Sequence, residues 1–402
     1  MEETMRYFYK LTIFIFIFSF SSIFCQALDR KALRSEAKDL LEREHFAEAL
    51  EKFQLLLKLE EASDSELWDD FHSAQRCLTR LSRIPEIDEL LAELKAHKPT
   101  SWWLHWRMGR YIIDMPSWGI MHEGKFYRAS HTIRGKHLNV SGRNRHESLW
   151  HYEKARVLLE KQAAEEKDKL NFYLDYAAAF LLQKREIFLD RSFIYNLSNF
   201  SWHLQKLLNL QEISDWEASE KYYISTKGAT VNEQGDAVFY EKPASFAAAK
   251  NDGERFRWLL QQAAEISEHG AERAKLMLAN FSYSLFGVHT LQTRNWFAAY
   301  DDASNLELQK KLQLLEGLQD NETLAQLANG MKRFNLPEDY SYIKLFKEIS
   351  QANETSLQKI AFYNLARIYE NRQQFEKALQ YWQEYEKLHP KGAENPIRQI
   401  TG

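Results

Sequence analysis

Two histidines five residues apart are the strongest candidates for metal chemistry in this chain. His146 and His151 lie in an expected helix with Glu147 beside the first. Zinc proteases use two histidines at i and i+4 with a glutamate in that place. Spacing of i+5 turns the second imidazole by roughly 140° around the helix axis. His122-Glu123 begins the same pattern, but Phe126 stands where the second histidine ligand would be needed. A capped, solvated helix start explains His146 and His151 better, and we predict no metal site.

A basic stretch is the next candidate, and it runs from the end of an expected hairpin at Arg128 to the start of an expected helix at His146. Its cationic and imidazole residues are Arg128, His131, Arg134, Lys136, His137, Arg143 and Arg145. It lacks the length and the regular aromatic interleaving of a nucleic-acid surface, and the whole chain carries a net charge of -4 from 57 acidic and 53 basic residues. We therefore predict no nucleic-acid partner. A solvated loop is favoured, and a contact with anionic lipid or glycan stays open.

Tryptophans crowd the segment just before this stretch. Trp102, Trp103 and Trp106 stand close together in the sequence. They either form a platform for a sugar or a peptide, or pack in the core between helices and a hairpin, and core packing is favoured. With Arg128 and Arg134 they make our candidate interaction surface.

The remaining motifs of enzymes are missing from the sequence. We find no nucleophile-elbow pattern, no glycine-rich phosphate loop, no dinucleotide fingerprint and no paired cysteines with metal spacing. Cys77 stands in a helical pattern beside Leu78, which favours a small buried apolar residue. We therefore predict no catalytic residue, no cofactor and no enzymatic activity.

The first residues have the features of an export signal. Arg6 and Lys10 precede the uncharged, mostly apolar run Leu11–Phe24. Fourteen helical residues rise about 21 Å, short of the roughly 30 Å of a bilayer core. We predict a cleaved signal peptide over 1–27 and a periplasmic, envelope-associated or secreted protein. An uncleaved anchor, or lipid attachment at Cys25, is the less favoured alternative.

The elements that must position these residues are mostly helical, and the last unit, Leu357–Pro390, shows the pattern most clearly. Apolar, small and aromatic residues alternate on two helices before a closing proline. The predicted core is Phe362, Leu365, Ala366, Tyr369, Ala378, Trp382 and Pro390. This order resembles a tetratricopeptide repeat, although Tyr385 stands where a small residue is usual. Leu28–Glu60 resembles a weaker copy.

We therefore predict a mostly α fold of tetratricopeptide-like helical hairpins in an α-solenoid, with two small β-hairpin inserts. One hairpin spans Ile120–Arg128 and turns at Glu123-Gly124, and the other spans 229–240 with Gly235 in its turn. Further helices are predicted over Ser65–Leu81, Ile87–Ala96, His146–Glu165, Lys169–Leu182, Ser198–Leu210, Asn251–Ser267, His269–Leu285, Glu307–Gln319, Glu322–Met331 and Tyr340–Ser350.

Six segments follow from these patterns. They are a signal peptide (1–27), a helical repeat-like segment (28–99), a tryptophan-rich irregular insert with a hairpin (100–146), a helical array with a hairpin insert at about 222–246 (147–350), the terminal repeat (351–390) and the start of a following region or a tail (391–402).

Several short strings, taken in order, resemble the N-terminal region of large exported bacterial alpha-2-macroglobulin-like proteins. They are Lys125-Phe-Tyr-Arg128 with Arg134-Gly135, Gly228-Ala-Thr-Val-Asn-Glu-Gln-Gly235, Asp252-Gly-Glu-Arg-Phe-Arg-Trp258, Phe286-Gly-Val-His-Thr-Leu291, Gly330-Met-Lys-Arg-Phe-Asn-Leu-Pro337 and the terminal repeat. The resemblance covers the chain from about Trp102 to Gly402. It implies the leading helical module of an endopeptidase-inhibitor-like protein, a protease trap whose bait and thioester segments are not in this sequence. No inhibitory residue follows from it.

Two functions of different kinds remain open. The first is a non-enzymatic scaffold module at the N-terminus of such an inhibitor-like protein, with more chain expected after Gly402. The second is a free-standing envelope or periplasmic tetratricopeptide-type adaptor for protein–protein interaction. Both expect protein partners, either proteases or envelope proteins, and a membrane contact only through an uncleaved signal or a lipid anchor.

Overall fold

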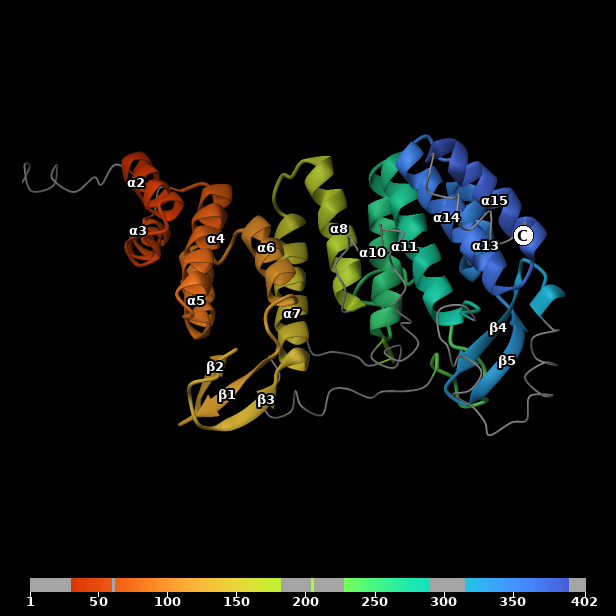
Figure 1. Ribbon diagram of the computed structural model, residues 1–402, viewed down its shortest axis with the longest axis horizontal. Helices are drawn as coiled ribbons and strands as arrows, with labels where there is room; N and C mark the ends of the chain where they lie inside the picture. The colour runs from red at the N-terminus through yellow and green to blue at the C-terminus, as the bar shows by residue number, and fades with distance from the viewer. Residues whose placement is uncertain (1–29, 60–61, 182–203, 206–227, 290–314, 390–402) are drawn as a thin grey trace, which may run out of the picture. The chain divides into compact units, whose positions relative to one another are not determined.

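The chain folds mostly into helices, with two small antiparallel sheets (Figure 1). This computed structural model describes residues 30–59, 62–181, 204–205, 228–289 and 315–389. The predicted signal peptide, most of the predicted helices Ser198–Leu210 and Glu307–Gln319, Pro390 and the segment 391–402 lie outside these residues. Two compact units are present. One combines the chain up to Arg107 with Pro116–Leu138, and the other combines Met108–Met115 with the chain from Asn139 onward.

Helices of the first unit pack through apolar stripes and one buried carboxylate. They are α2 (Arg30–Glu42), α3 (Phe46–Lys58), α4 (Asp64–Arg80), α5 (Ile87–His97) and the first half of α6 (Trp102–Ile112). Ser63 and Glu66 cap the start of α4 reciprocally, which satisfies two backbone donors that a helix start leaves free. Asp70 of α4 is fully buried and accepts hydrogen bonds from Arg30 and Arg34 of α2 at 2.8 Å and 2.7 Å. These charged contacts fix α2 against α4.

The predicted hairpin over Ile120–Arg128 is confirmed. Strand β1 (Trp118–His122) pairs antiparallel with β2 (Lys125–Arg128), and β3 (Lys136–Asn139) lies on the other side of β1. Glu123 and Gly124 both take positive φ, 48° and 77°, as a two-residue turn of the mirror-image type requires. The preceding residues differ from the prediction, since Trp102–Ile112 forms helix α6 within the segment expected to be irregular.

Helical pairs also build the second unit. Its helices are α7 (Ser141–Leu159), α8 (Glu166–Phe180), α10 (Asp252–Ile266), α11 (Glu268–Phe286), the short η4 (Glu338–Tyr340), α13 (Tyr342–Ile349), α14 (Thr355–Asn371) and α15 (Phe375–Leu388). Tyr152 of α7 stacks on Tyr176 of α8 with ring centroids 5.0 Å apart, and both rings are buried. The α10 and α11 boundaries agree with the predicted helices to within a residue or two.

The predicted helix over Glu322–Met331 is wrong. These residues form strand β4 (Glu322–Leu327) and the start of strand β5 (Gly330–Asn335), paired antiparallel with Leu327 opposite Gly330. Gly330 has φ of 127°, which a side chain would strain. The second predicted hairpin, over 229–240, is reduced to a turn at Gly235 and one bridge between Val231 and Ala237, while Ala229 pairs in parallel with Leu327.

The terminal hairpin α14–α15 has a dense aromatic core. Leu365, Ala366, Tyr369, Ala378 and Trp382 are buried, whereas Phe362 is only half-buried. Tyr385, which departs from the repeat pattern, is buried beside Ala366 and Trp382, so the small Ala366 leaves room for two large rings.

One buried guanidinium ties this hairpin to its neighbours. Arg372, at the end of α14, donates to the carbonyl oxygens of Gln319 and Glu322 at 3.0 Å and 2.7 Å and to the Tyr342 hydroxyl at 2.6 Å. Its side chain is fully buried, so these three acceptors replace the water that the charge has lost. The end of α14 is thereby fixed against β4 and α13.

None of the helices within the described ranges combines the length and the apolar character that a membrane crossing needs.

Candidate functional site

The predicted interaction surface is corrected by burial. Trp102 and Trp106 are buried, with their rings stacked 5.8 Å apart, and Trp103 is half-buried with its edge toward Trp106. The Arg107 guanidinium lies over the rings of Trp103 and Trp106 at 5.2 Å and 5.7 Å. These aromatic rings therefore form internal packing of the first unit and no open platform.

Arg128 is also internal, and Arg134 alone of the five predicted residues is exposed. The Arg128 guanidinium grips the Asp88 carboxylate, with Nη2 to Oδ1 at 2.7 Å and Nε to Oδ2 at 3.0 Å, and Nη1 donates to the Pro116 carbonyl. This two-point pairing orients β2 against the first turn of α5. The five residues do not form one surface.

The predicted solvated helix start at His146 is wrong, because α7 already begins at Ser141 and both His146 and His151 are buried in it. The rings of His151 and Trp150 are nearly perpendicular, with centroids 4.9 Å apart. Within the described residues, no group of three or more histidine, cysteine, aspartate or glutamate side chains could hold a metal ion.

A groove that the sequence does not reveal lies in the second unit, with its base formed by two helices. Along α10 it is lined by Arg257, Leu260, Gln261 and Ala264, and along α11 by Ala271, Ala274, Lys275 and Leu278. Each set follows the i, i+3, i+4, i+7 spacing of one helix face. Small alanines on both helices leave the space that forms the groove. We call it the α10–α11–α13 groove.

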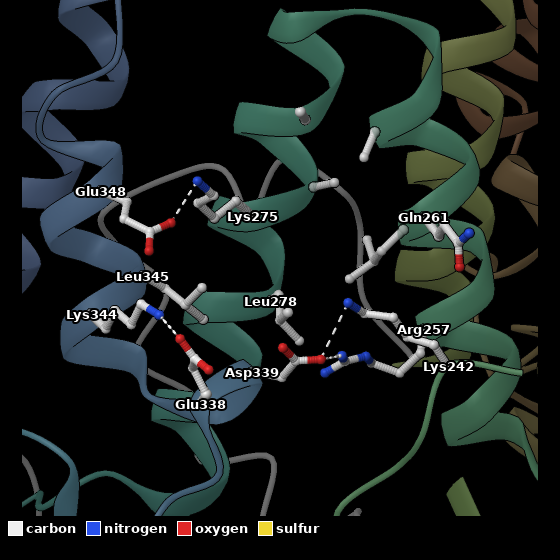
Figure 2. A pocket seen from close by; sticks show the side chains of 14 residues that line it. Lys242, Arg257, Gln261, Lys275, Leu278, Glu338, Asp339, Lys344, Leu345 and Glu348 are labelled. Atoms are coloured by element: carbon white, nitrogen blue, oxygen red, sulfur yellow. Dashed lines mark hydrogen bonds and ion pairs between the residues drawn. The ribbon is translucent and has the colours of Figure 1, made fainter.

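The opposite wall comes from η4 and α13 and meets the helices through ion pairs (Figure 2). Asp339 of η4 accepts from Arg257 at 2.6 Å and from Lys242 at 3.2 Å. Lys275 of α11 reaches Glu348 of α13 at 2.7 Å. Lys344 pairs with Glu338, and the neighbouring Leu345 also lines the groove.

The charged residues at the rim of the groove are paired with residues of opposite charge. Burial acts to raise the pKa of Asp339, but the Arg257 and Lys242 charges outweigh it and lower that pKa below its ordinary value. The hydrogen bond to Glu338 raises the pKa of the exposed Lys344. Asp339 and Lys344 are therefore charged at neutral pH. The pairs between half-exposed residues, Lys242–Asp339 and Lys275–Glu348, contribute about 0–1 kcal/mol each, so a ligand can exchange them at little cost. Arg257 is buried, so its pair with Asp339 is not among them.

The groove encloses about 550 Å³, within the usual range for ligand sites. Leu260, Ala264, Leu278 and Leu345 supply an apolar floor beneath the charged rim. The lining side chains are alkyl, amide, ammonium, guanidinium and carboxylate groups, with no imidazole, thiol or hydroxyl among them. Such a surface offers apolar contact and orientation by charge, which is the chemistry of binding.

Sequence reasoning missed this groove because its lining runs from Lys242 to Glu348 across four elements. Each stripe by itself resembles the core face of an amphipathic helix. The one available signal was the run of alanines at Ala264, Ala271 and Ala274, whose small side chains also occur in close helix packing.

Comparisons of the chain with protein-family models, with curated proteins and with solved structures found no match.

Proposed function

We propose that the chain is a non-enzymatic helical scaffold whose α10–α11–α13 groove holds a segment of a partner protein. The observation that carries this proposal is the composition of the groove, an apolar floor under a rim of exchangeable ion pairs. An apolar side chain of the partner would fill the floor, and charged residues on either side of it would exchange with the rim. Protein interfaces combine an apolar centre and a polar rim in this way.

The context we propose is that of an exported alpha-2-macroglobulin-like protein with an endopeptidase-inhibitor role. The short strings that resemble this family include residues that are tightly packed or buried in the structure. A Cβ on Gly253 would lie 2.3 Å from the Tyr240 ring, and one on Gly228 would lie 2.4 Å from the Leu327 backbone. Asp252, in the same string, is fully buried beside Arg145 and Arg255. These packing demands concern this chain, and the inhibitor context rests on the resemblance.

A free-standing periplasmic or envelope adaptor is the second candidate. The α14–α15 hairpin favours it, because its buried small and aromatic residues pack two helices closely, as tetratricopeptide-like hairpins do. The helical hairpins would then form a protein-binding array in its own right.

A pull-down from the envelope fraction of the source tests the proposal, with the encoded chain length checked in parallel. Ala264 is half-buried at the groove, so Ala264→Trp should fill the space without entering the core. Ala47→Trp on the exposed face of α3 is the matched control. We expect a partner that is recovered by the wild type and the control and lost with Ala264→Trp.

The identity of that partner separates the two contexts. Recovery of exported proteases, together with an encoded product longer than this chain, would support the inhibitor module. Recovery of a single assembly-machinery protein, together with an encoded product of this length, would support the adaptor. Equal recovery of every partner by the wild type and Ala264→Trp would overturn the groove as the binding site.

A further inference from the structure

A second pocket, in the first unit, is lined by one face of α4 and the end of α2. Its volume is about 430 Å³. His72, Arg76 and Arg80 are spaced by four residues along α4, which places them in one row. Ser73, Thr79 and Leu41 complete most of the wall, and no carboxylate lines it.

The two arginines of this row differ from most other arginines of the described chain. Neither Arg76 nor Arg80 forms an ion pair with a described residue, and the recorded contact of Arg80 is with the ring of Phe46 at 5.8 Å. By contrast, Arg30 and Arg34 bind Asp70, and Arg83 binds Glu86 at 2.6 Å. Two neighbouring guanidinium groups are thus exposed, with no ion-pair partner among the residues that the structure describes.

His72 adds little positive charge to the pocket. Loss of solvent around the ring, followed by the charge of Arg107, lowers the pKa of His72 below its usual value. The ring lies edge-on to Trp68 at 4.8 Å. At neutral pH the pocket therefore owes its positive potential to Arg76 and Arg80.

The place of the pocket on its helix decides which anion fits. Phosphate sites commonly use backbone N–H groups at a helix N-terminus, where the dipole favours negative charge. This pocket lies along the C-terminal half of α4, so its donors are side chains. A planar guanidinium pairs in a two-point contact with carboxylate and phosphate alike. Because the pocket lacks the helix N-terminus that phosphate sites commonly use, we assign carboxylates to it.

The spacing of the two arginines indicates how the carboxylates are arranged. Residues four apart on a helix are separated by about 6 Å along its axis. In an extended segment, residues two apart are about 6.6–6.8 Å apart and point to the same side. Acidic residues at alternate positions of an extended chain would therefore meet Arg76 and Arg80 together.

We propose that the α2–α4 pocket binds an extended acidic segment of a partner protein, with one carboxylate on Arg76 and the next but one on Arg80. This rests on the proposed function in that the ligand is a protein segment, but it concerns another site in the other compact unit. A purified peptide can test it without the groove.

Fluorescence anisotropy with the purified chain and two labelled pentapeptides provides the test. One peptide carries glutamates at its second and fourth positions, and the other has the same composition with the glutamates adjacent. We expect the alternating peptide to bind more tightly. Arg76→Gln and Arg80→Gln should each weaken it by up to about fivefold, the upper end of the range for exposed charge pairs, and added salt should weaken it further.

Arg43→Gln is the matched control, since Arg43 lies exposed just after α2 and already pairs with Asp39. It should leave the affinity unchanged, as should Ala264→Trp in the groove. Equal binding of the two peptides, or unchanged affinity in the Arg76→Gln, Arg80→Gln double variant, would overturn the proposal. Competition by inorganic phosphate at least as strong as that by the acidic peptide would overturn the carboxylate assignment.

Discussion

Two aromatic residues of α15 belong to the same helical pattern in the sequence but differ in burial. Trp382 is almost fully buried, and its indole N–H donates to Glu370 at 2.8 Å, whereas Phe375 leaves half of its surface exposed. Both belong to the apolar pattern of the terminal repeat, so periodicity alone treats them alike. Contacts with Ala366 and Tyr385 decide which of them belongs to the core.

Trp382→Ala should therefore lower the free energy of unfolding by about 3–5 kcal/mol, because it leaves a cavity and removes the donor to Glu370 Oε1, while Arg367 still pairs with Oε2. Phe375→Ala, in the same helix, should cost less than about 1 kcal/mol. Urea denaturation of both variants measures the difference. Similar losses in the two variants would contradict this assignment of core and surface.

Gly253 is a second position at which the packing depends on a single residue. It lies in the first turn of α10, where a Cβ would come within 2.3 Å of the Tyr240 ring, and Tyr240 is itself buried. Gly253→Ala should destabilise the chain by about 1–3 kcal/mol through overpacking. Gly317→Ala meets no atom within 4 Å and should be neutral. Thermal unfolding of the pair tests this, and a neutral Gly253→Ala would show that Tyr240 is free to shift.

The buried arginine side chains could not be predicted from the sequence. The sequence indicates that Trp106 and Leu365 are apolar core candidates, because Trp106 belongs to a cluster of tryptophans and Leu365 stands at helical spacing. It gives no sign that Arg128 or Arg372 is buried, since the partners of Arg128 and Arg372 lie roughly ten to fifty residues away in the chain. Such pairings depend on the tertiary fold.

At the scale of elements, long helices were predictable and one hairpin was not. The segment Glu322–Met331 has few β-branched residues, and Leu324, Leu327 and Ala328 suit a helix. Asn329-Gly330 was the turn signal that should have outweighed this pattern. The Thr323 hydroxyl donates to the Phe286 carbonyl at 2.5 Å and Ala229 pairs with Leu327, so contacts from distant segments favour the strand.

Asp320 joins three helices of the second unit and should make their packing sensitive to acid. It accepts from Lys347 of α13 at 2.6 Å and from the Tyr369 hydroxyl of α14 at 3.0 Å, and Lys377 of α15 lies 3.5 Å away. Burial acts to raise the pKa of Asp320, but these hydrogen bonds and charges outweigh it and lower that pKa.

A lowered pKa in the folded state gives stability above the ordinary aspartate value of about 3.9, which is lost as the pH falls through the lower folded-state value. Asp320→Asn should therefore be less stable than the wild type at about pH 6 and should lose less stability on acidification to about pH 3. Urea unfolding at the two pH values measures both effects. Parallel losses in wild type and variant would contradict the role of Asp320.

At the scale of the whole molecule, the described chain divides into two compact units, and each carries its own candidate site. The sequence predicted a mostly helical chain with antiparallel inserts. It did not predict the groove, because helix periodicity cannot tell an alanine stripe that packs against a neighbour from one that leaves space. Tertiary placement of η4 and α13 opposite α10 and α11 creates that space.

The most direct measurement of the central claim is site-specific photo-crosslinking from Gln261, an exposed residue of the groove. A photoreactive residue there should form a covalent adduct with a partner protein in the envelope fraction, and adding Ala264→Trp should abolish that adduct. The same residue at the exposed Gln383 of α15 is the control. No adduct from Gln261, or an adduct that survives Ala264→Trp, would contradict the binding of a partner in the α10–α11–α13 groove.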